Sequence, residues 1–261
     1  MPETARPPLR RVAVLIPTYN ERDTLPVLLR RLREVVPDVD VAVLDDNSPD
    51  GTGRVADRLA ASDEQVHVIH RAGKEGLGAA YLAGFRWALA EEYDAVVEMD
   101  ADGSHRPEHL PALLTAAADA DVVIGSRWVR GGSVVNWPLH RKVLSVGGNL
   151  YVKLLLGMPV NDATAGYRVY RADALRAMGL QDVASQGYCF QTDLTWRAVR
   201  TGLRVVEVPI TFVEREVGTS KMSRDVMTES LRRITGWGVR HRARQLRALV
   251  GLPREPRWHE L

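Results

Sequence analysis

The sequence predicts a doubly wound α/β fold, in which helices cover both faces of one mostly parallel sheet. Short β-branched runs alternate with helical stretches through the first half of the 261-residue chain. The strand-like runs are continuously apolar, which is typical of strands that are buried on both faces. The composition, with 45% hydrophobic and 26% charged residues, is that of a globular protein with a large core. These three observations exclude disorder, collagen and a coiled coil for the whole chain.

The expected elements follow one another without a repeat or a low-complexity linker. Residues 12–16 are the first predicted strand, and 25–36 are the first helix because its leucines fall on one face. Further strands and helices are then predicted in alternation at 41–44, 54–61, 66–69, 77–91, 95–99, 110–118 and 121–124. Regularity weakens after about residue 125, where glycine pairs interrupt a polar and aromatic stretch. One more strand is predicted at 205–208.

Cysteine content and hydropathy narrow the class of protein. The single Cys189 excludes an internal disulfide framework and a cysteine-built zinc site, and it suits a reducing compartment. No run reaches the roughly 18 apolar residues of a membrane span. The first eleven residues hold three arginines and no long apolar stretch, so no secretory signal is expected. We therefore expect a cytoplasmic location.

The net charge of +2 hides an asymmetry along the chain. Residues 1–220 hold 25 Lys and Arg against 29 Asp and Glu, whereas residues 221–261 hold 10 against 4. The tail also has an apolar stripe at helical spacing, made of Met227, Leu231, Ile234 and Trp237. One or two basic helices are predicted there. Their basic side is either a solvated face or a surface for nucleic acid, anionic lipid or an acidic partner.

Polar, turn-rich segments follow four of the predicted strands, at residues 17–21, 45–52, 71–78 and 100–102. Because ligands bind beyond the carboxyl ends of parallel strands, these segments should meet at one edge of the sheet. Asp100 and Asp102 lie at such a strand end, where both carboxylates can turn towards one hard cation. Mg²⁺ or Mn²⁺, with a nucleotide diphosphate and water completing the shell, would suit this pair.

Other residues in these segments allow two interpretations each. Asp45 and Asp46 could accept hydrogen bonds from a nucleoside, although the residues that follow them are also strong turn formers. The glycines around Lys74 could bring backbone N–H groups to a phosphate, or could simply allow the turn into the next helix. The second half of the chain holds more cations than a metal-bound diphosphate needs, which suggests a second anionic ligand.

Ordered motifs over roughly residues 12–223 resemble glycosyltransferase family 2 and, within it, the dolichol- or polyprenol-phosphate mannose synthases. Motifs that recur across the family are IPTYNE at 16–21, DDNSPDGT at 45–52, and DAD at 100–102 followed by His105 and Pro107. GSR follows at 125–127. Motifs typical of the polyprenol-phosphate branch are NWPLHRK at 136–142, DATAGYR at 162–168, GYCFQ at 187–191 and GTSK at 218–221.

The resemblance implies a GT-A fold and an inverting transfer of mannose from GDP-mannose to a polyprenyl (dolichyl-type) monophosphate. Residues 1–221 would form the GT-A domain, and residues 222–261 a basic segment that docks on a membrane or a partner. The protein would then be peripherally associated with the cytoplasmic face of a membrane. Attachment would occur through this tail or through an integral-membrane partner protein. Nucleic acid is not expected as a partner, because the body is acidic.

The resemblance also assigns site residues by motif position. The nucleotide-sugar site is expected to contain Pro17, Tyr19, Glu21, Asp46, Lys74, Asp100 and Gln191. Asp193 would face the sugar beside Gln191, with no assigned role for either. The metal ligands would be Asp100 and Asp102, with Ser104 as a less certain third. The acceptor phosphate would be held by Arg127, Arg141, Ser145, Arg215 and Lys221.

The expected chemistry is mostly alignment and charge stabilisation. The acceptor phosphate is already anionic at pH 7, so it needs no strong general base. The metal would offset the charge that develops on the leaving nucleoside diphosphate. Asp100, Asp102, Arg127, Arg141 and Arg215 are therefore the expected catalytic group. Two alternatives stay open, a polyprenyl-phosphate hexosyltransferase that uses a UDP-sugar and a non-catalytic nucleotide- or lipid-phosphate-binding module.

Overall fold

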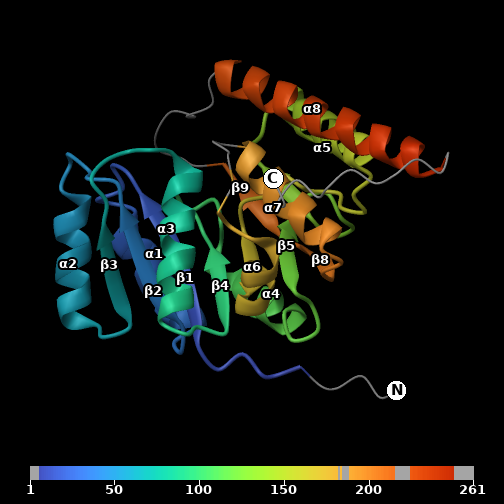
Figure 1. Cartoon of the computed structure of the whole chain (residues 1–261). Helices are drawn as coiled ribbons and strands as arrows, with labels where there is room; N and C mark the ends of the chain where they lie inside the picture. Colours follow the sequence, from blue (N-terminus) through green and yellow to red (C-terminus); the bar gives the residue numbers. More distant parts are fainter. Residues whose placement is uncertain (1–5, 182, 184–187, 215–223, 250–261) are drawn as a thin grey trace.

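A seven-stranded sheet forms the centre of the protein (Figure 1). The computed structural model describes residues 6–181, 183, 188–214 and 224–249. Within helices, the side chains of residue 188 and of residues 224–230 and 244–249 lie outside this description. Across the sheet the strands follow the order β3 (Val66–His70), β2 (Asp40–Asp45), β1 (Val12–Thr18), β4 (Ala95–Glu98), β7 (Arg168–Arg171), β5 (Val122–Ser126) and β8 (Val205–Pro209).

Six of these strands point the same way, and β7 runs antiparallel to both of its neighbours, β4 and β5. The mostly parallel sheet is thus confirmed, and the carboxyl ends of the six strands meet at one edge. No strand was predicted at β7, because its sequence, RVYR, begins and ends with a charge. The strand forms because the guanidinium of the fully buried Arg168 is satisfied by the carbonyl oxygens of Ala163, Ala165 and Gln191.

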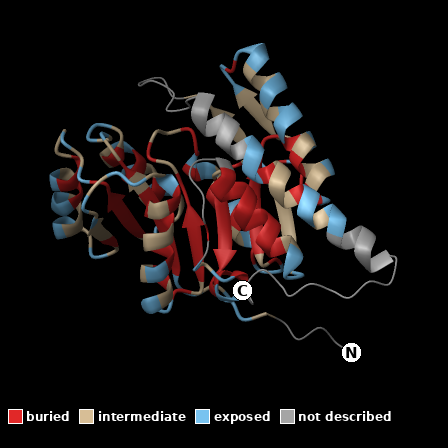
Figure 2. Ribbon diagram, turned by 45° about the horizontal axis from the view of Figure 1, so that its top comes forward, coloured by how far each residue is buried: buried red, intermediate tan, exposed pale blue. Residues whose placement is uncertain are grey.

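Helices cover both faces of the sheet, whose central strands are buried (Figure 2). Alternate strand residues point into two separate hydrophobic clusters. Val14 and Ile16 of β1 face one cluster, and Ala13 and Leu15 face the other. The first face is covered by α1 (Leu25–Val35), α2 (Thr52–Ser62) and α4 (Leu110–Ala116), the last preceded by a 3₁₀ turn at Pro107–His109. The second face is covered by α3 (Leu77–Ala90), α5 (Leu139–Leu156), α6 (Ala172–Met178) and α7 (Tyr188–Arg200).

The region after residue 125 is more regular than its sequence indicates. It contains α5, α6 and α7, and a separate parallel pair of short strands, β6 (Ser133–Val135) and β9 (Thr211–Val213). Helix α5 continues through Gly147 and Gly148, the pair that was expected to interrupt regular structure. Its buried residues Val152 and Leu156 belong to the second hydrophobic cluster, so tertiary packing outweighs the low helix propensity of glycine.

The basic tail contains one long helix, α8 (Arg224–Leu249). Ile234 is buried in the second cluster, and the ring of Trp237 stacks on that of Trp196 from α7 at a centroid distance of 5.7 Å. Leu231, which was expected on the same apolar stripe, is exposed. The described part of α8 is therefore packed onto the body. The division between residues 221 and 222 lies outside the described residues and stays a prediction.

Helix α8 lies along α5, as Figure 1 shows. The hydroxyls of Tyr151 and Thr235 are 2.8 Å apart, and Arg242 Nη2 donates to the carbonyl oxygen of Leu154 at 2.5 Å. Gly238 allows the two helices to approach closely, since a Cβ at this position would lie 2.2 Å from Leu155 Cγ. Across the described part of the chain, no helix has the length and apolar character needed to cross a membrane.

We predict that Gly238→Ala separates α8 from α5. The added methyl overlaps the Leu155 side chain, and overpacking of this kind costs about 1–3 kcal/mol of unfolding free energy. Urea denaturation measures the loss, and amide hydrogen exchange locates it in α8. Gly236→Ala is the matched control, because its Cβ would meet only Arg240 Nη2, at 3.6 Å. Equal stability of the two variants would contradict the close packing of these helices.

Candidate active site

The polar segments after β1, β2 and β3 meet at the carboxyl edge of the sheet, as the sequence predicts. The ammonium group of Lys74, which follows β3, lies over the ring of Tyr19, which follows β1, at 4.4 Å from the centroid. The backbone N–H of Glu21 donates to Thr52 Oγ1 at 3.0 Å, and this contact joins the segments after β1 and β2. Pro17 lies within β1 itself, at the start of this junction.

The two neighbouring aspartates after β2 have different partners. Asp45 accepts hydrogen bonds from the hydroxyls of Thr18 at 3.1 Å and Ser48 at 2.6 Å, so it closes the turn. Asp46 forms an ion pair with Arg71, which also bonds Glu75 at 2.7 Å. Burial raises the pKa of Asp46 above its ordinary value, although the Arg71 guanidinium opposes the shift. The turn interpretation therefore holds for Asp45, and the nucleoside contact of Asp46 stays a prediction.

The backbone of Asp100 is held in place by the imidazole of His105. The backbone N–H of Asp100 donates to Nδ1 of His105 at 2.9 Å, and the hydroxyl of Tyr81 donates to Asp100 Oδ1 at 3.3 Å. His105 is buried, with its ring 5.0 Å from that of Tyr167 and 5.7 Å from that of Phe212. Because Nδ1 accepts a hydrogen bond, the proton of the neutral ring lies on Nε2. His105, which follows the DAD motif, thus positions the Asp100 backbone.

Asp102 is positioned by Ser104, whose N–H donates to Asp102 Oδ1 at 3.0 Å and whose hydroxyl also bonds this oxygen. The Asp100 side chain is 33% exposed, so it is accessible from the edge of the sheet. Two carboxylates that lie two residues apart in the loop after β4 are hard donors that fit Mg²⁺ or Mn²⁺. Among the described residues, no three or more His, Cys, Asp or Glu side chains form a metal-binding group. A cation here would take its remaining ligands from water and substrate.

A buried polar layer lies next to the Asp100 loop. Glu98, at the end of β4, is fully buried, and burial raises its pKa to about 8 while the Arg168 guanidinium opposes the shift. The hydroxyl of Tyr170 donates to Glu98 Oε2 at 3.3 Å. Gln191 is also buried, and its amide lowers the pKa of Glu98. Glu98 was not identified as a site residue from the sequence. A single glutamate near the end of an apolar run is equally consistent with an ordinary polar strand end.

Asp193, the other α7 residue that was expected to face the sugar, is engaged within its own helix. Its Oδ1 accepts a hydrogen bond from Arg197 Nε at 2.9 Å, and both side chains are buried. Burial raises the pKa of Asp193, while the Arg197 guanidinium lowers it in part. The predicted contacts of Gln191 and Asp193 with a sugar stay predictions.

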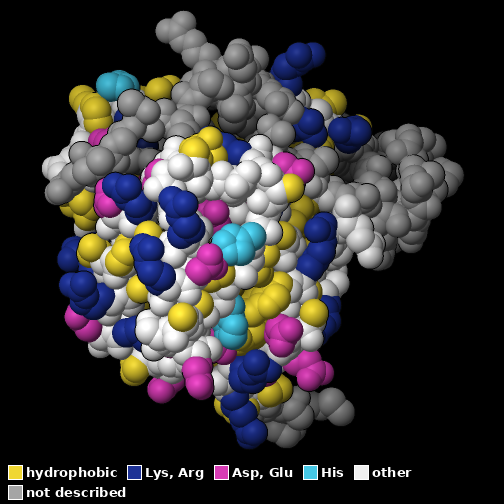
Figure 3. All heavy atoms as spheres, turned by 90° about the vertical axis from the view of Figure 1, so that its left-hand side faces the viewer, with side chains coloured by type: hydrophobic (Ala, Val, Ile, Leu, Met, Phe, Trp, Pro, Cys, Tyr) yellow, Lys and Arg dark blue, Asp and Glu magenta, His cyan; other side chains and the backbone are white. Residues whose placement is uncertain are grey.

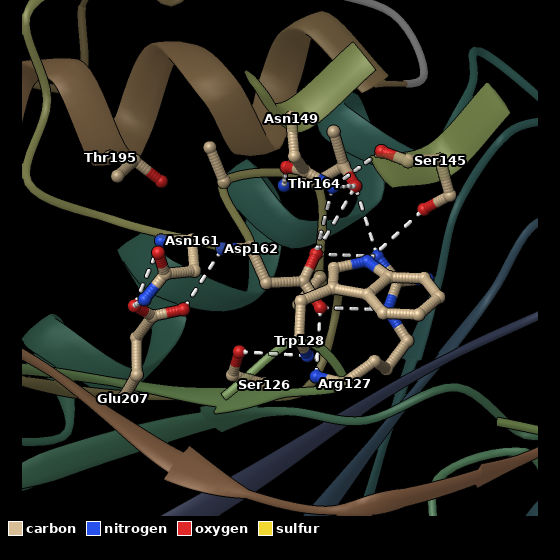
Figure 4. Close-up of polar contacts among 12 residues, drawn as sticks. Ser126, Arg127, Trp128, Ser145, Asn149, Asn161, Asp162, Thr164, Thr195 and Glu207 are labelled. Carbon is tan, nitrogen blue, oxygen red and sulfur yellow. Dashed lines mark hydrogen bonds and ion pairs between the residues drawn. The ribbon is translucent and has the colours of Figure 1, made fainter. Parts of the chain in front are cut away.

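Arg127, at the end of β5, forms a buried ion pair with Asp162 (Figure 4). Its Nε and Nη2 atoms donate to the two carboxylate oxygens at 2.8 and 2.6 Å, and its backbone N–H donates at 2.9 Å. Asp162 also accepts from Asn149 Nδ2 of α5 at 3.3 Å. Asp162 has no exposed surface and Arg127 is 6% exposed. The pair fixes the position of the Arg127 side chain, and the predicted contact of Arg127 with the acceptor phosphate stays a prediction.

Glu207 of β8 fixes the loop that carries Asp162. Its carboxylate accepts from the backbone N–H groups of Asn161 at 2.8 Å and Asp162 at 2.9 Å, as Figure 4 shows. The network therefore joins β5, α5, the loop of residues 161–164 and β8. Asp162 lies in the DATAGYR motif, but neither Asp162 nor Glu207 was assigned a role from the sequence.

The other described candidates for phosphate binding lie on α5 beside this network. Trp128 Nε1 donates to Ser145 Oγ at 3.2 Å. The Arg141 guanidinium lies 4.3 Å from the ring centroid of Trp137 and forms an ion pair with Glu214. The Arg127 guanidinium lies 5.4 Å from the same Trp137 centroid. The structure thus brings Arg127, Arg141 and Ser145 together around two indole rings. Arg215 and Lys221 lie outside the described residues.

Residues 13–179 match the family model described as glycosyl transferase family 2. The chain is 58% identical over 242 residues to a Micrococcus luteus protein named undecaprenyl-phosphate mannosyltransferase, covering 93% of this chain and all of that protein. It is 54% identical over 251 residues to a Mycolicibacterium smegmatis protein named polyprenol monophosphomannose synthase, covering 95% and 94%. The chain belongs to glycosyltransferase family 2, as its motifs predict.

Solved structures show the same fold at low sequence identity. Glucosyl-3-phosphoglycerate synthase from Mycobacterium tuberculosis, in complex with phosphoglyceric acid, matches with a TM-score of 0.62 at 18% identity. The match covers 94% of this chain and 81% of that one. The same enzyme with Mn²⁺, uridine diphosphate and glucosyl-3-phosphoglycerate matches with a TM-score of 0.61 at 20% identity, with the same coverage. The predicted GT-A architecture is confirmed by these likenesses.

We predict that Asp162→Asn destabilises the protein by about 3–5 kcal/mol, because it leaves the buried Arg127 guanidinium without its counter-charge. Urea denaturation gives the free energy of unfolding. Asp173→Asn is the control, since that carboxylate is 89% exposed and pairs with Arg176 on the surface. Its effect should stay within about 0.5 kcal/mol. Similar losses in both variants would contradict the positioning role of the buried pair.

Proposed function

We propose that the protein catalyses the inverting, metal-dependent transfer of mannose from GDP-mannose to a polyprenyl monophosphate. The observation that carries this proposal is the match, over more than nine-tenths of the chain, to relatives named as mannosyl enzymes of undecaprenyl or polyprenol phosphate. The product, a polyprenyl-phosphate mannose, would serve as a lipid-linked sugar donor for glycan or lipoglycan assembly or for protein mannosylation.

The site geometry supports a division of labour at the carboxyl edge. Asp100 and Asp102 would hold the cation, which when bound offsets the charge on the leaving diphosphate. The segments with Pro17, Tyr19, Glu21, Asp46 and Lys74 meet one another at this edge, which suits a nucleoside diphosphate. Gln191, buried beside Glu98, would form the sugar end of that site.

The acceptor side of the proposal rests on the α5 residues. Arg141 and Ser145 would bind the acceptor phosphate directly, and Asp162 would hold Arg127 in register with them. A phosphate oxygen would form the new bond to the anomeric carbon as the bond from that carbon to the diphosphate breaks on the opposite side. This single displacement inverts the configuration and releases GDP. The cations would offset the repulsion between the two phosphate-bearing substrates.

We infer that the protein meets its lipid acceptor at the cytoplasmic surface of a membrane, because a polyprenyl chain resides in the bilayer. The basic segment of residues 222–261 would contribute to this attachment. An integral-membrane partner protein is the alternative means of attachment. The described part of α8, with exposed Arg232, Arg240 and Arg242, supports a basic surface that contacts anionic headgroups.

A donor panel tests the sugar and the nucleotide together. The protein is incubated with Mg²⁺, a polyprenyl phosphate and labelled GDP-mannose, UDP-glucose or UDP-galactose. We expect a mild-acid-labile glycolipid from GDP-mannose only. Transfer from a UDP-sugar with none from GDP-mannose would overturn the donor assignment and would leave the acceptor assignment in place.

We predict that Asp102→Ala lowers transfer from GDP-mannose by roughly a hundredfold or more, since metal-ion stabilisation of a leaving group contributes several kcal/mol. Circular dichroism should show an unchanged fold. Asp57→Ala is the control, because this half-exposed carboxylate lies on α2 and bonds His70. Chelation of divalent ions should abolish the wild-type activity, and added Mn²⁺ or Mg²⁺ should restore it. Full activity of Asp102→Ala with metal would refute the metal assignment.

A further inference from the structure

Helix α5 presents a continuous apolar row to its surroundings. The residues of this row are between 47% and 75% exposed and follow one another at spacings of four, three, four and four, so they share one face of the helix. They are Leu139, Val143, Val146, Leu150 and Leu154. Leu144 is also exposed, on another face of the helix. The exposed Gly147, next to the row, adds no polar side chain to it.

The inward face of the same helix carries polar side chains as well as the buried Val152 and Leu156. Ser145 accepts its bond from Trp128, Asn149 is buried against Asp162, and Arg141 lies on Trp137. A surface helix of a globular protein normally turns polar residues outward, so an exposed apolar row on its outer face is unusual. Contiguous exposed apolar surface of this kind marks an interaction site.

Exposed arginines lie on α8, the helix that packs along α5, and Arg242 contacts the Leu154 backbone. Helix α8 packs along α5, and its described side chains, residues 231–243, include no Asp or Glu. Arg232, Arg240 and Arg242 are exposed there, together with the apolar Leu231 and Val239. At the opposite end of the molecule, basic and acidic side chains are interspersed (Figure 3). Exposed apolar residues with flanking arginines are the composition of helices that lie in a membrane interface.

We propose that the apolar row of α5 inserts into the surface of a bilayer that contains anionic lipid, with the α8 arginines on the headgroups. This proposal rests on the proposed function in one respect, that the acceptor is a lipid phosphate. A second copy of the chain is a poorer occupant, because a two-fold contact through this face would bring like-charged α8 arginines together. Anionic headgroups would instead neutralise them.

The placement gives α5 two functions at once. Arg141 and Ser145 lie on the first two turns of the helix whose outer face begins at Leu139. Insertion of that face to the level of the headgroups would hold these two residues at the depth of the lipid phosphates. The acceptor phosphate would reach them while its hydrocarbon chain stays in the bilayer. The lipid contact would therefore lie on α5, with the basic tail contributing charge.

Vesicle flotation without any sugar donor tests the proposal. The full chain is mixed with phosphatidylcholine vesicles that contain or lack phosphatidylglycerol. We expect flotation with the anionic vesicles, and about tenfold or greater weakening in the double variant Val143→Asp, Leu150→Asp, which places two charges on the inserted face. Val27→Asp on α1 is the matched control, because Val27 is 52% exposed and Leu150 is 53% exposed. This control should bind as the wild type does.

A second pair of variants separates the charge contribution from the apolar one. Arg232→Gln with Arg240→Gln should weaken binding to anionic vesicles and reduce its sensitivity to salt. The apolar-row variant should keep its urea midpoint and its transfer to a short-chain polyprenyl phosphate in detergent. Vesicle binding by a wild-type protein that transfers no mannose would refute the proposed function and leave this inference standing.

Three results would overturn the inference. The first is unchanged flotation of the apolar-row double variant, and the second is an equal loss in Val27→Asp. The third is a wild-type dimer that the double variant converts to a monomer while flotation stays the same, which would make the row a contact between copies. Sedimentation velocity of both proteins distinguishes this last case.

Discussion

The buried ion pair between Arg127 and Asp162 is the interaction on which the second half of the site depends. Removing both charges from water costs several kcal/mol per ion, and the cost is recovered only when the remaining hydrogen-bonding positions are filled. Asn149, Thr164 and the Arg127 backbone fill those of Asp162. Glu207 holds the loop that presents it. One carboxylate thus fixes the relative positions of a strand end, a helix and a loop.

This constraint also determines how α5 is oriented. The helix must turn Asn149 towards Asp162 and Ser145 towards Trp128, so its polar side faces inward. The leucines and valines of its other side are then left outside the core. The charge cluster at the active site and the exposed apolar row are therefore two consequences of one helix orientation. A site built in this way couples the binding of an anionic group to the surface through which a lipid would approach.

The first half of the fold and the edge that carries the site could be predicted from local pattern. Apolar runs of four or five residues gave strands within one or two residues of β1 to β5, and the DAD motif falls where β4 ends. In the second half the strand predicted at 205–208 is confirmed as β8. The strand β7 and the helix α5 could not be predicted, because β7 carries an arginine at each end and α5 carries a glycine pair. Both elements form only because partners distant in sequence satisfy or cover them, as the Arg168 guanidinium does with the carbonyls of the 163–165 loop.

Short ordered patterns in the chain were enough to predict the doubly wound class, the convergence of polar segments at one edge, and the family. The pairing of charges became visible only in the folded protein. Arg71 forms an ion pair with Asp46, and Asp162 forms one with Arg127, which lies 35 residues away in the sequence. The folded protein also shows which apolar residues of α5 are exposed, namely Leu139, Val143, Val146, Leu150 and Leu154. The pairing of charges and the exposure of side chains depend on distances between elements. These distances cannot be inferred from a local periodicity in the sequence.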